Sequence, residues 1–196
     1  YTISHKLYDS NPETKTAAAI LLGAGGVMLL EKLGWEPDVY HLNESHALPL
    51  AFYLYDRYKS PEKVKEKLVF TNHTPEEASN QKSSVRFLEK MSFFCNVPQA
   101  ELKLLTQDAV TQVDHTLTCL RLSKKANGVS ALHRQTLCAT WGEKDKTCPI
   151  SSVTNAQNFS YWGDMELYDE LKRNNNTTLQ RIKKDRKRLL FDYVAD

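Results

Sequence analysis

The sequence has few of the residue types that define several specialised protein classes. Its 196 residues include only seven glycines, seven prolines and four cysteines. These counts exclude collagen, low-complexity disorder and a small disulfide-rich scaffold. Hydrophobic residues make up 41% of the chain, and a chain of this size buries about 70% of its unfolded surface when it folds. The composition therefore supports independent folding without a metal or disulfide crosslinks.

The sequence also lacks an excess of charge of one sign. It has 26 Lys and Arg against 24 Asp and Glu, a net charge of +2, so nucleic acid is not an expected partner. The cysteines contain no C-x-x-C pair and the histidines no paired ligand spacing. We therefore expect no metal site and a reducing, cytoplasmic location. The cysteines are Cys95, Cys119, Cys138 and Cys148.

No signal peptide or membrane-spanning run is evident. The chain begins Tyr-Thr-Ile-Ser-His-Lys without an initiator methionine, which suggests a piece of a longer protein. The longest apolar run, 17–30, is shorter than the roughly 20 residues that a bilayer requires. We therefore expect a buried helix and no membrane partner. The five Asn-x-Ser/Thr matches would be glycosylation sites only in a secreted protein, so without a signal peptide we do not expect them to be used.

The residue pattern predicts an α/β fold. The region 13–33 is expected to form a central, well-covered helix that ends at Gly34. Strands are expected at 38–44, 67–72, 126–130 and 149–154. Further helices are expected at 48–58, 60–67, 84–94, 98–108, 111–122, after 130 through 141, and at 161–194 with a break near 174–176. Strands that alternate with helices indicate βαβ units and a Rossmann-like parallel sheet with flanking helices.

Polar residues follow three of these strands, at 43–46, 71–74 and 154–155. The carboxyl ends of parallel strands face one crevice, so we expect the three clusters to form one site. Hydroxyl, amide and imidazole groups suit a polyhydroxylated ligand, which needs both donors and acceptors. The alternative is that the Asn and Thr side chains only cap the helices that follow.

Other motifs are weaker. Gly23-Ala-Gly25-Gly26 is similar to a phosphate loop, but Met28 replaces the third glycine, so close helix packing is the favoured interpretation. The basic run 181–188 contains Ile182 and is interpreted as an amphipathic helix with a solvated charged face. No Ser-His-Asp arrangement or pair of carboxylates supports a self-contained hydrolase.

Several segments, in this order, resemble the α-glucan phosphorylases, the family of glycogen, starch and maltodextrin phosphorylases, and most of all its shorter bacterial branch. They are Leu7-Tyr8, Ile20–Val27, Val39–His46, Phe70–Pro75, Glu77-Ala78, Ala126–Ser130 with His133, and Val153–Asn155. The resemblance implies the two-domain GT-B glycosyltransferase architecture. Residues 1–160 would be the later part of the N-terminal, glucan-binding domain, and 161–196 a helical segment that leads into a C-terminal domain absent from this sequence.

The resemblance implies a reaction as well. Inorganic phosphate would cleave the terminal α-1,4 bond of a glucan and release glucose 1-phosphate with retained configuration. Pyridoxal phosphate would act as the proton relay, attached to a lysine outside this sequence, so the chain alone would be inactive. The implied partners are an α-1,4-glucan, phosphate and the C-terminal domain, and a homo-oligomer stays open.

Individual roles at the strand ends follow from the same resemblance. His73 would be catalytic, since it would contact the transferred glucosyl unit where positive character develops. Glu44 and His46 would line the acceptor side, and Asn155 would hydrogen-bond a glucose hydroxyl. The implied substrate contacts are Glu44, His46, Asn72, Glu77, Gly128 and Asn155.

The resemblance implies two further roles, and several of the residues at the strand ends also have a simpler interpretation. Glu77 would shape the loop after His73, and Gly128 would let the backbone approach the sugar because it has no Cβ. Glu44 is alternatively a helix cap, Asn127 only a turn residue, and His133 a packed histidine rather than a ligand.

At two positions where the family usually has glycine, this sequence has Ser45 and Ala156. The added Cβ of Ala156 could crowd the glucosyl subsite. Two alternatives therefore remain beside a phosphorylase. One is a non-catalytic glucan-binding protein. The other is a nucleotide-sugar-dependent glycosyltransferase, which the Thr-Asn-His-Thr segment at 71–74 disfavours.

Overall fold

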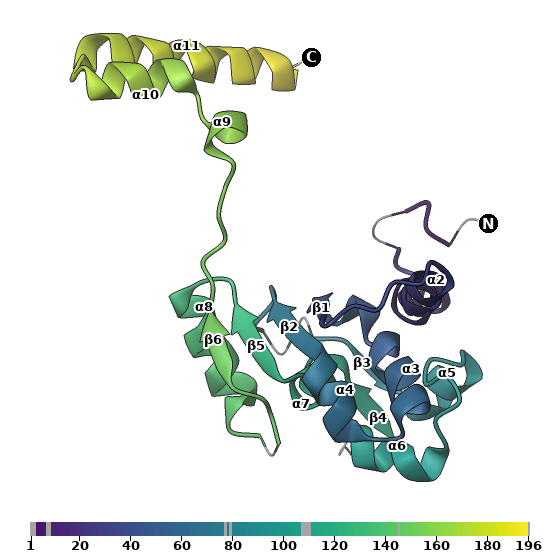
Figure 1. Ribbon diagram of the computed structural model, residues 1–196. Helices are drawn as coiled ribbons and strands as arrows, with labels where there is room; N and C mark the ends of the chain where they lie inside the picture. The colour runs from purple at the N-terminus through teal and green to yellow at the C-terminus, as the bar shows by residue number, and fades with distance from the viewer. Residues whose placement is uncertain are drawn as a thin grey trace. The chain divides into compact units, whose positions relative to one another are not determined.

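The computed structural model describes residues 3–6, 9–76, 78, 80–106, 111–144 and 146–195. The chain divides into two compact units, Tyr1–Thr154 and Asn155–Asp196, which are described separately (Figure 1). The predicted boundary between residues 160 and 161 stays a prediction.

The first unit is built on a parallel sheet of four strands. These are β1 (Tyr40–Asn43), β2 (Leu68–Asn72), β5 (Lys125–Gly128) and β6 (Ile150–Ser152), in the order β1-β2-β5-β6 (Figure 1). In the register, Leu42 lies opposite Phe70 and Phe70 opposite Ala126, and all three side chains are buried. The predicted α/β fold with a parallel sheet and flanking helices is confirmed.

Helices between the strands complete the core. They are α3 (Pro49–Tyr58), α4 (Pro61–Lys67), α7 (His115–Leu122) and α8 (Ala131–Leu137), which continues as a π-helical turn over Cys138–Gly142. Each of α4, α7 and α8 begins at a side chain that accepts a backbone N–H, namely Ser60, Asp114 and Ser130, as helix N-caps do. Phe52 and Trp141 are fully buried beside them.

The predicted central helix exists, but it is not well covered. It consists of α1 (Pro12–Ile20), a π-helical stretch (Leu21–Gly25) and α2 (Gly26–Lys32). Its length of 21 residues and its composition alone would suffice to span a membrane, yet only 22% of its most apolar window is buried. More than half of the residue surface is exposed at Leu21, Leu22, Met28, Leu29 and Leu33. The prediction of a buried helix is therefore wrong, because only one side of this helix packs on the rest of the unit.

That packed side depends on a small residue. A Cβ at Gly23 would lie 2.8 Å from the carbonyl oxygen of Ala47 and 2.8 Å from the backbone nitrogen of Leu50, whereas a Cβ at Gly26 would meet nothing within 4 Å. Close packing therefore explains Gly23, which confirms the favoured interpretation of this glycine-rich segment.

A second, two-stranded sheet was not predicted. β3 (Lys82–Ser84) and β4 (Gln112–Asp114) pair in antiparallel fashion, so the helix predicted at 111–122 starts at His115 instead. Two helices lie between these strands, α5 (Val85–Lys90) and α6 (Gln99–Thr106). The helix predicted at 84–94 stops at Lys90, and positive φ angles at Ser92 and Cys95 turn the chain.

The second unit is helical, as predicted. It contains α9 (Phe159–Trp162), α10 (Met165–Lys172) and α11 (Asn176–Ala195). The predicted break is confirmed at Asn174, which has a φ of 55°. Arg186 of α11 contacts Asp164 and Glu166, both at 2.8 Å. Ile182 is buried among the exposed charged residues of 181–188, which confirms the amphipathic interpretation.

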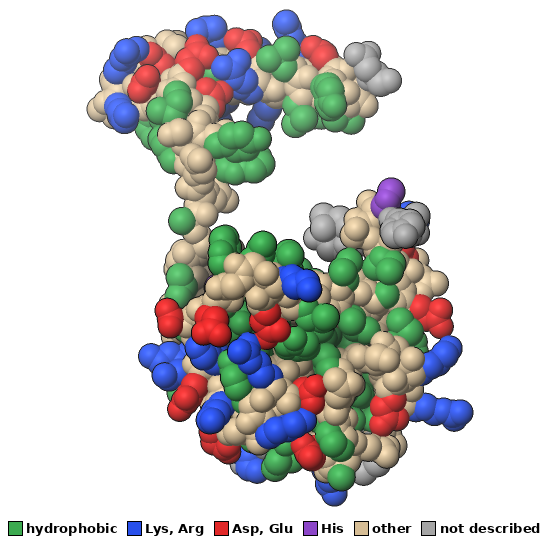
Figure 2. Space-filling view, turned by 45° about the vertical axis from the view of Figure 1, so that its right-hand side comes forward, with side chains coloured by type: hydrophobic (Ala, Val, Ile, Leu, Met, Phe, Trp, Pro, Cys, Tyr) green, Lys and Arg blue, Asp and Glu red, His purple; other side chains and the backbone are tan. Residues whose placement is uncertain are grey.

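The charged side chains are mixed in sign. Figure 2 shows Lys and Arg interspersed with Asp and Glu over the visible face of the first unit. Such mixing matches the nearly balanced charge count of +2.

Candidate functional site

The carboxyl ends of the parallel strands lie along one edge of the sheet. The register pairs Asn43 with Thr71, Asn72 with Gly128, and Gly128 with Ser152. The polar segments that follow β1 and β2 therefore meet, as predicted. Asn155 belongs to the second unit and is exposed, whereas Glu77 lies outside the described residues.

Glu44 joins the ends of β1 and β2. Its backbone N–H donates to the carbonyl oxygen of Thr71 at 2.9 Å, and its side chain accepts the backbone N–H of His73. Glu44 precedes the short 3-10 helix Ser45–Ala47, but its side chain caps no N–H of that helix. The cap interpretation of Glu44 is therefore wrong for its side chain.

The backbone of Glu44 is strained. Its φ of 63° and ψ of 176° lie in a region that favours glycine, and holding another residue there costs about 1–3 kcal/mol. The hydrogen bonds to Thr71 and His73 help to offset this cost. Such strain, held by contacts to two strand ends, is typical of a functional site.

A chain of side-chain hydrogen bonds crosses the sheet from β1 to β5. His41 Nε2 lies 2.7 Å from Thr71 Oγ1, and the Thr71 hydroxyl donates to Asn127 Oδ1 at 2.8 Å. Because the Thr71 hydroxyl donates its only proton to Asn127, His41 Nε2 must be the donor in its hydrogen bond to Thr71 Oγ1. Asn127 is thus a strand residue that bonds to β2, and the interpretation as a turn residue is wrong.

A buried hydrogen-bonded pair, His133 and Asn72, lies beside this row of hydrogen bonds. His133 Nε2 is 2.9 Å from Asn72 Oδ1, and burial lowers the pKa of His133, which favours a neutral ring that donates from Nε2. Within the described part of the chain, Asn72 Nδ2 has no hydrogen-bond partner although it is buried. His133 is 9% exposed, so its prediction as a packed histidine is confirmed.

His133 also gives a reason for Gly128 that the sequence did not show. A Cβ at Gly128 would lie 2.8 Å from Cδ2 of His133 and 3.0 Å from the backbone nitrogen of Arg134. The close approach that requires a glycine here is thus made by the start of α8. An approach of sugar to Gly128 stays a prediction.

A cavity of about 440 Å³ opens next to Glu44. From the predicted site it takes in Glu44, Ser45, His46 and Thr74. The rest of its lining was missed: Ser10, Pro12, Lys15, Asn80, Gln81, Lys82, Ser83 and Thr116. These residues come from the start of α1 and the chain just before it, from β3 and the segment that leads into it, and from the first turn of α7. No sequence pattern signals them, and the position of Lys82 and Ser83 depends on the unpredicted two-stranded sheet.

A neutral histidine lies behind this wall. His115 is 3% exposed, and its Nε2 lies 3.0 Å from Ser83 Oγ. Burial lowers the pKa of His115 to about 4, against a smaller opposing effect of Asp114. His115 therefore stays uncharged near neutral pH and can hold Ser83 in place.

The described residues suit hydroxyl groups better than a metal ion. Among them, no three His, Cys, Asp or Glu side chains gather closely enough to hold a metal ion. The cavity wall carries one carboxylate, Glu44, and two lysines, Lys15 and Lys82, so its charge does not exclude an anion. Amides, hydroxyls and imidazoles offer both donors and acceptors.

Comparisons with known proteins agree with this fold. Residues 1–146 match the sequence model of the starch synthase catalytic domain. The chain is 35% identical, over its whole length, to an uncharacterized protein of Methanocaldococcus jannaschii and covers 37% of it.

Two phosphorylases are related more distantly. A maltodextrin phosphorylase of Thermococcus litoralis is 30% identical over 94% of this chain and 23% of its own length. A glycogen phosphorylase of Aquifex aeolicus is 30% identical over 86% of this chain and 27% of its own length. The chain thus spans well under half of each of these relatives. It belongs to the starch synthase catalytic domain family and is related to the glucan phosphorylases.

Proposed function

We propose that this chain is part of an α-glucan phosphorylase, which uses inorganic phosphate to release glucose 1-phosphate from the end of an α-1,4-glucan. The observation that supports this most is the contact between Glu44 and His73 at the strand ends, in a chain related to two phosphorylases. We place the protein in the cytoplasm, since the cysteines are free thiols.

In this proposal, Glu44 fixes the backbone at His73. Since Glu44 occupies the N–H of His73, the imidazole and carbonyl groups of His73 are left to contact a glucosyl unit. Both offer electron pairs, which stabilise the positive character that develops at the sugar ring in the transition state. The N–H-to-carboxylate contact would keep these groups in place during the reaction.

The neighbouring groups would bind sugar hydroxyls. His46 and Thr74 line the cavity with Glu44 and provide donors and acceptors for the acceptor part of the glucan. Asn72 Nδ2 is a buried donor that has not been satisfied within the described residues. An ordered water or a hydroxyl reached through a small shift would satisfy it.

Pyridoxal phosphate belongs to the proposed protein as a whole. It would supply a phosphate group that relays a proton to and from the substrate phosphate. The strand-end cavity is lined by two lysines, Lys15 and Lys82, beside the Glu44 carboxylate, and this charge alone does not identify a site for the cofactor's phosphate. We assign no residue of this chain to that cofactor, and its attachment lysine is proposed to lie elsewhere in the protein.

A second candidate is a nucleotide-sugar-dependent glycosyltransferase. The match of residues 1–146 to the starch synthase catalytic domain favours it. The two candidates differ in the glucosyl donor, which is a glucan end plus phosphate in one case and a nucleoside diphosphate glucose in the other. A glucan-binding protein without catalysis would use neither donor.

The donor decides between these candidates. The full-length protein that contains this chain would be incubated with maltoheptaose and either phosphate or ADP-glucose. We expect glucose 1-phosphate with phosphate, together with the absorbance of a pyridoxal Schiff base. Chain elongation from ADP-glucose alone would favour the glycosyltransferase, and no turnover with either donor would leave the binding protein.

A further inference from the structure

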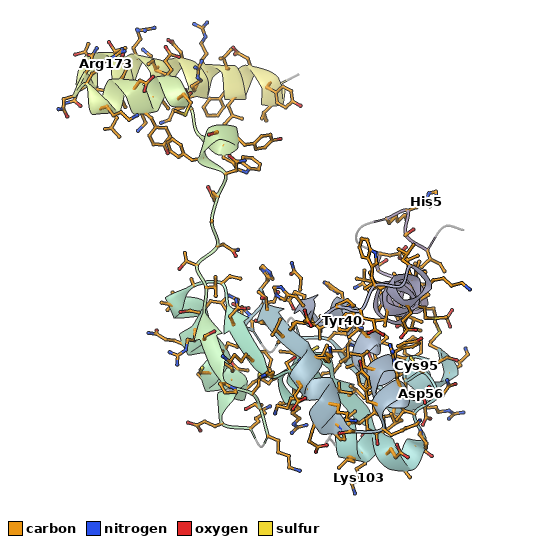
Figure 3. All side chains as sticks on the ribbon, in the orientation of Figure 1. His5, Tyr40, Asp56, Cys95, Lys103 and Arg173 are labelled. Atoms are coloured by element: carbon orange, nitrogen blue, oxygen red, sulfur yellow. The ribbon has the colours of Figure 1, made fainter. Side chains whose placement is uncertain are left out.

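The strand-end cavity has a second polar wall without a role in the proposed reaction. Asn80 belongs to this wall, together with Ser83 of β3 and Thr116 of α7. The same cavity is lined by Glu44, which follows β1, the strand in which Figure 3 labels Tyr40. Asn80 lies outside the segments that resemble the α-glucan phosphorylases, so the resemblance assigns it no role.

Hydrogen bonds hold this wall against the start of α7. The backbone N–H of Thr116 donates to Asn80 Oδ1 at 3.4 Å, and the backbone N–H of His115 donates to the carbonyl oxygen of Gln81 at 3.0 Å. His115 Nε2 lies 3.0 Å from Ser83 Oγ. Because these bonds tie the wall to α7, a ligand in the cavity meets polar groups that are already ordered, and less conformational entropy is lost on binding.

Only one of the two polar atoms of the Asn80 side chain is paired. Its oxygen accepts the N–H of Thr116 in the first turn of α7, where backbone N–H groups lack partners within the helix. Its nitrogen, Nδ2, is shielded from solvent and has no hydrogen-bond partner among the described residues. An unpaired buried donor destabilises the fold. Capping of α7 therefore explains the oxygen of Asn80 but not the nitrogen.

An aspartate at position 80 would cap α7 without an unpaired donor. Amide and carboxylate oxygens both accept N–H groups at a helix start, and the helix dipole favours the charge of a carboxylate there. The amide of Asn80 cannot turn round to pair its nitrogen, because the N–H of Thr116 requires an acceptor. The donor is therefore what distinguishes Asn80 from an aspartate, and an acceptor atom of a ligand in the cavity would pair it.

The other groups of the cavity favour a ligand that both donates and accepts. The carboxylate of Glu44, which lines the cavity, is an acceptor only and needs a donor from the ligand, whereas Asn80 Nδ2 needs an acceptor. A sugar hydroxyl provides both, and a phosphate dianion provides only acceptors. The cavity volume of about 440 Å³ is within the range of ligand pockets.

We propose that Asn80 is a specificity-determining residue, whose Nδ2 donates to a hydroxyl oxygen of the acceptor part of the glucan. The choice of an α-1,4-glucan as the ligand rests on the proposed function. A site that is built to pair a substrate hydroxyl discriminates strongly against ligands that lack it, because its own polar group then stays unpaired. Since the contact is made before and during the reaction, its loss raises KM more than it lowers kcat.

The test compares Asn80→Asp with Asn158→Asp in the full-length protein. Asp at position 80 still accepts the N–H of Thr116 but has no donor. Asn158 accepts the N–H of Tyr161 at the start of α9 and does not line the cavity, so its variant makes the same change of charge at another helix cap. Calorimetry without phosphate measures the affinity for maltoheptaose, and separate experiments measure KM, kcat and thermal unfolding.

We expect Asn80→Asp to weaken the binding of maltoheptaose about tenfold, as for the loss of one hydrogen bond from a buried polar group. KM should rise by a similar factor, with kcat much less affected and the unfolding temperature close to that of the wild type. Asn158→Asp should match the wild type in all four measurements.

The outcomes separate this inference from the proposed function. Maltoheptaose binding that is weakened only in Asn80→Asp, in a protein without phosphorolysis, would support the role of Asn80 and refute only the proposed reaction. Phosphorolysis with unchanged affinity and KM in Asn80→Asp would overturn the role of Asn80 alone. Weaker binding that comes with a lower unfolding temperature would overturn it too, since Asn80 would then act only as a cap. So would weaker binding of inorganic phosphate with unchanged binding of maltoheptaose.

Discussion

The side chain of Glu44 accepts the backbone N–H of His73, a residue 29 positions further along the chain. The contact fixes the chain after β2 relative to the chain after β1. It also helps to hold a non-glycine residue at a φ of 63°.

The first prediction concerns this contact. Glu44→Gln keeps an acceptor oxygen, whereas Glu44→Ala removes it but keeps the backbone strain. We expect Glu44→Ala to reduce kcat of the full-length protein by about 10–100-fold, since displacing a positioned group by 1 Å can cost as much. Glu44→Gln should stay within a few-fold of the wild type. Steady-state kinetics with maltoheptaose would check this, and equal losses in the two variants would show that the charge matters rather than the contact.

The second prediction concerns Gly128 and His133. Gly128→Ala should destabilise the protein by about 1–3 kcal/mol, because the new methyl group overpacks the start of α8 at 2.8 Å from the His133 ring. His133→Ala added to Gly128→Ala should recover part of this loss. Urea unfolding of the single and double variants would measure the coupling, and strictly additive effects would contradict the proposed clash.

The third prediction concerns the long N-terminal helix. Gly23→Ala should be destabilising by about 1–3 kcal/mol, because its Cβ would lie 2.8 Å from two backbone atoms of the following segment. Gly26→Ala should instead be neutral or stabilising by up to about 1 kcal/mol, as expected in a helix. Thermal unfolding of this matched pair would check the packing, and similar effects of both substitutions would contradict it.

The fourth prediction is a pH dependence of stability. Burial lowers the folded-state pKa of His115 to about 4, below the value of about 6.5 for an unfolded histidine. Between these values the unfolded state binds the extra proton, so the free energy of unfolding falls as pH falls from 6.5 to 4. The loss is on the order of 3 kcal/mol across this window, with no further loss from His115 at lower pH.

His115→Gln serves as the comparison for this dependence. The amide cannot bind a proton in this range but can still hydrogen-bond Ser83. Urea unfolding at several pH values should give a flatter profile for the variant between pH 6.5 and 4. Parallel profiles for the two proteins would exclude His115 as the source.

The sequence was sufficient to predict the parallel sheet. Buried residues such as Leu42 and Phe70 stand in short apolar runs that end in polar clusters, and both the strands and the shared edge follow from that pattern. β3 could not be predicted, because Lys82–Ser84 is a short polar segment whose strand form depends on pairing with β4. The cavity wall at Ser83 and Thr116 was missed for the same reason.

The exposure of the N-terminal helix could not be predicted either. Leu22 and Leu29 belong to an apolar run, and such a run indicates a helix that needs a cover but does not show where the cover comes from. Similarly, the sequence shows a glycine at position 128, but only the structure shows that the ring of His133 packs against it.

The most direct test of the account is the rate of glucose 1-phosphate release from maltoheptaose and phosphate by the full-length protein and by its His73→Ala variant. We predict release by the wild type and a rate lower by about 10²–10³-fold in the variant, as for loss of a group that stabilises transition-state charge, with unchanged thermal stability. No release by the wild type, or an equal rate in the variant, would contradict the assignment of this chain as the glucosyl-binding part of a phosphorylase.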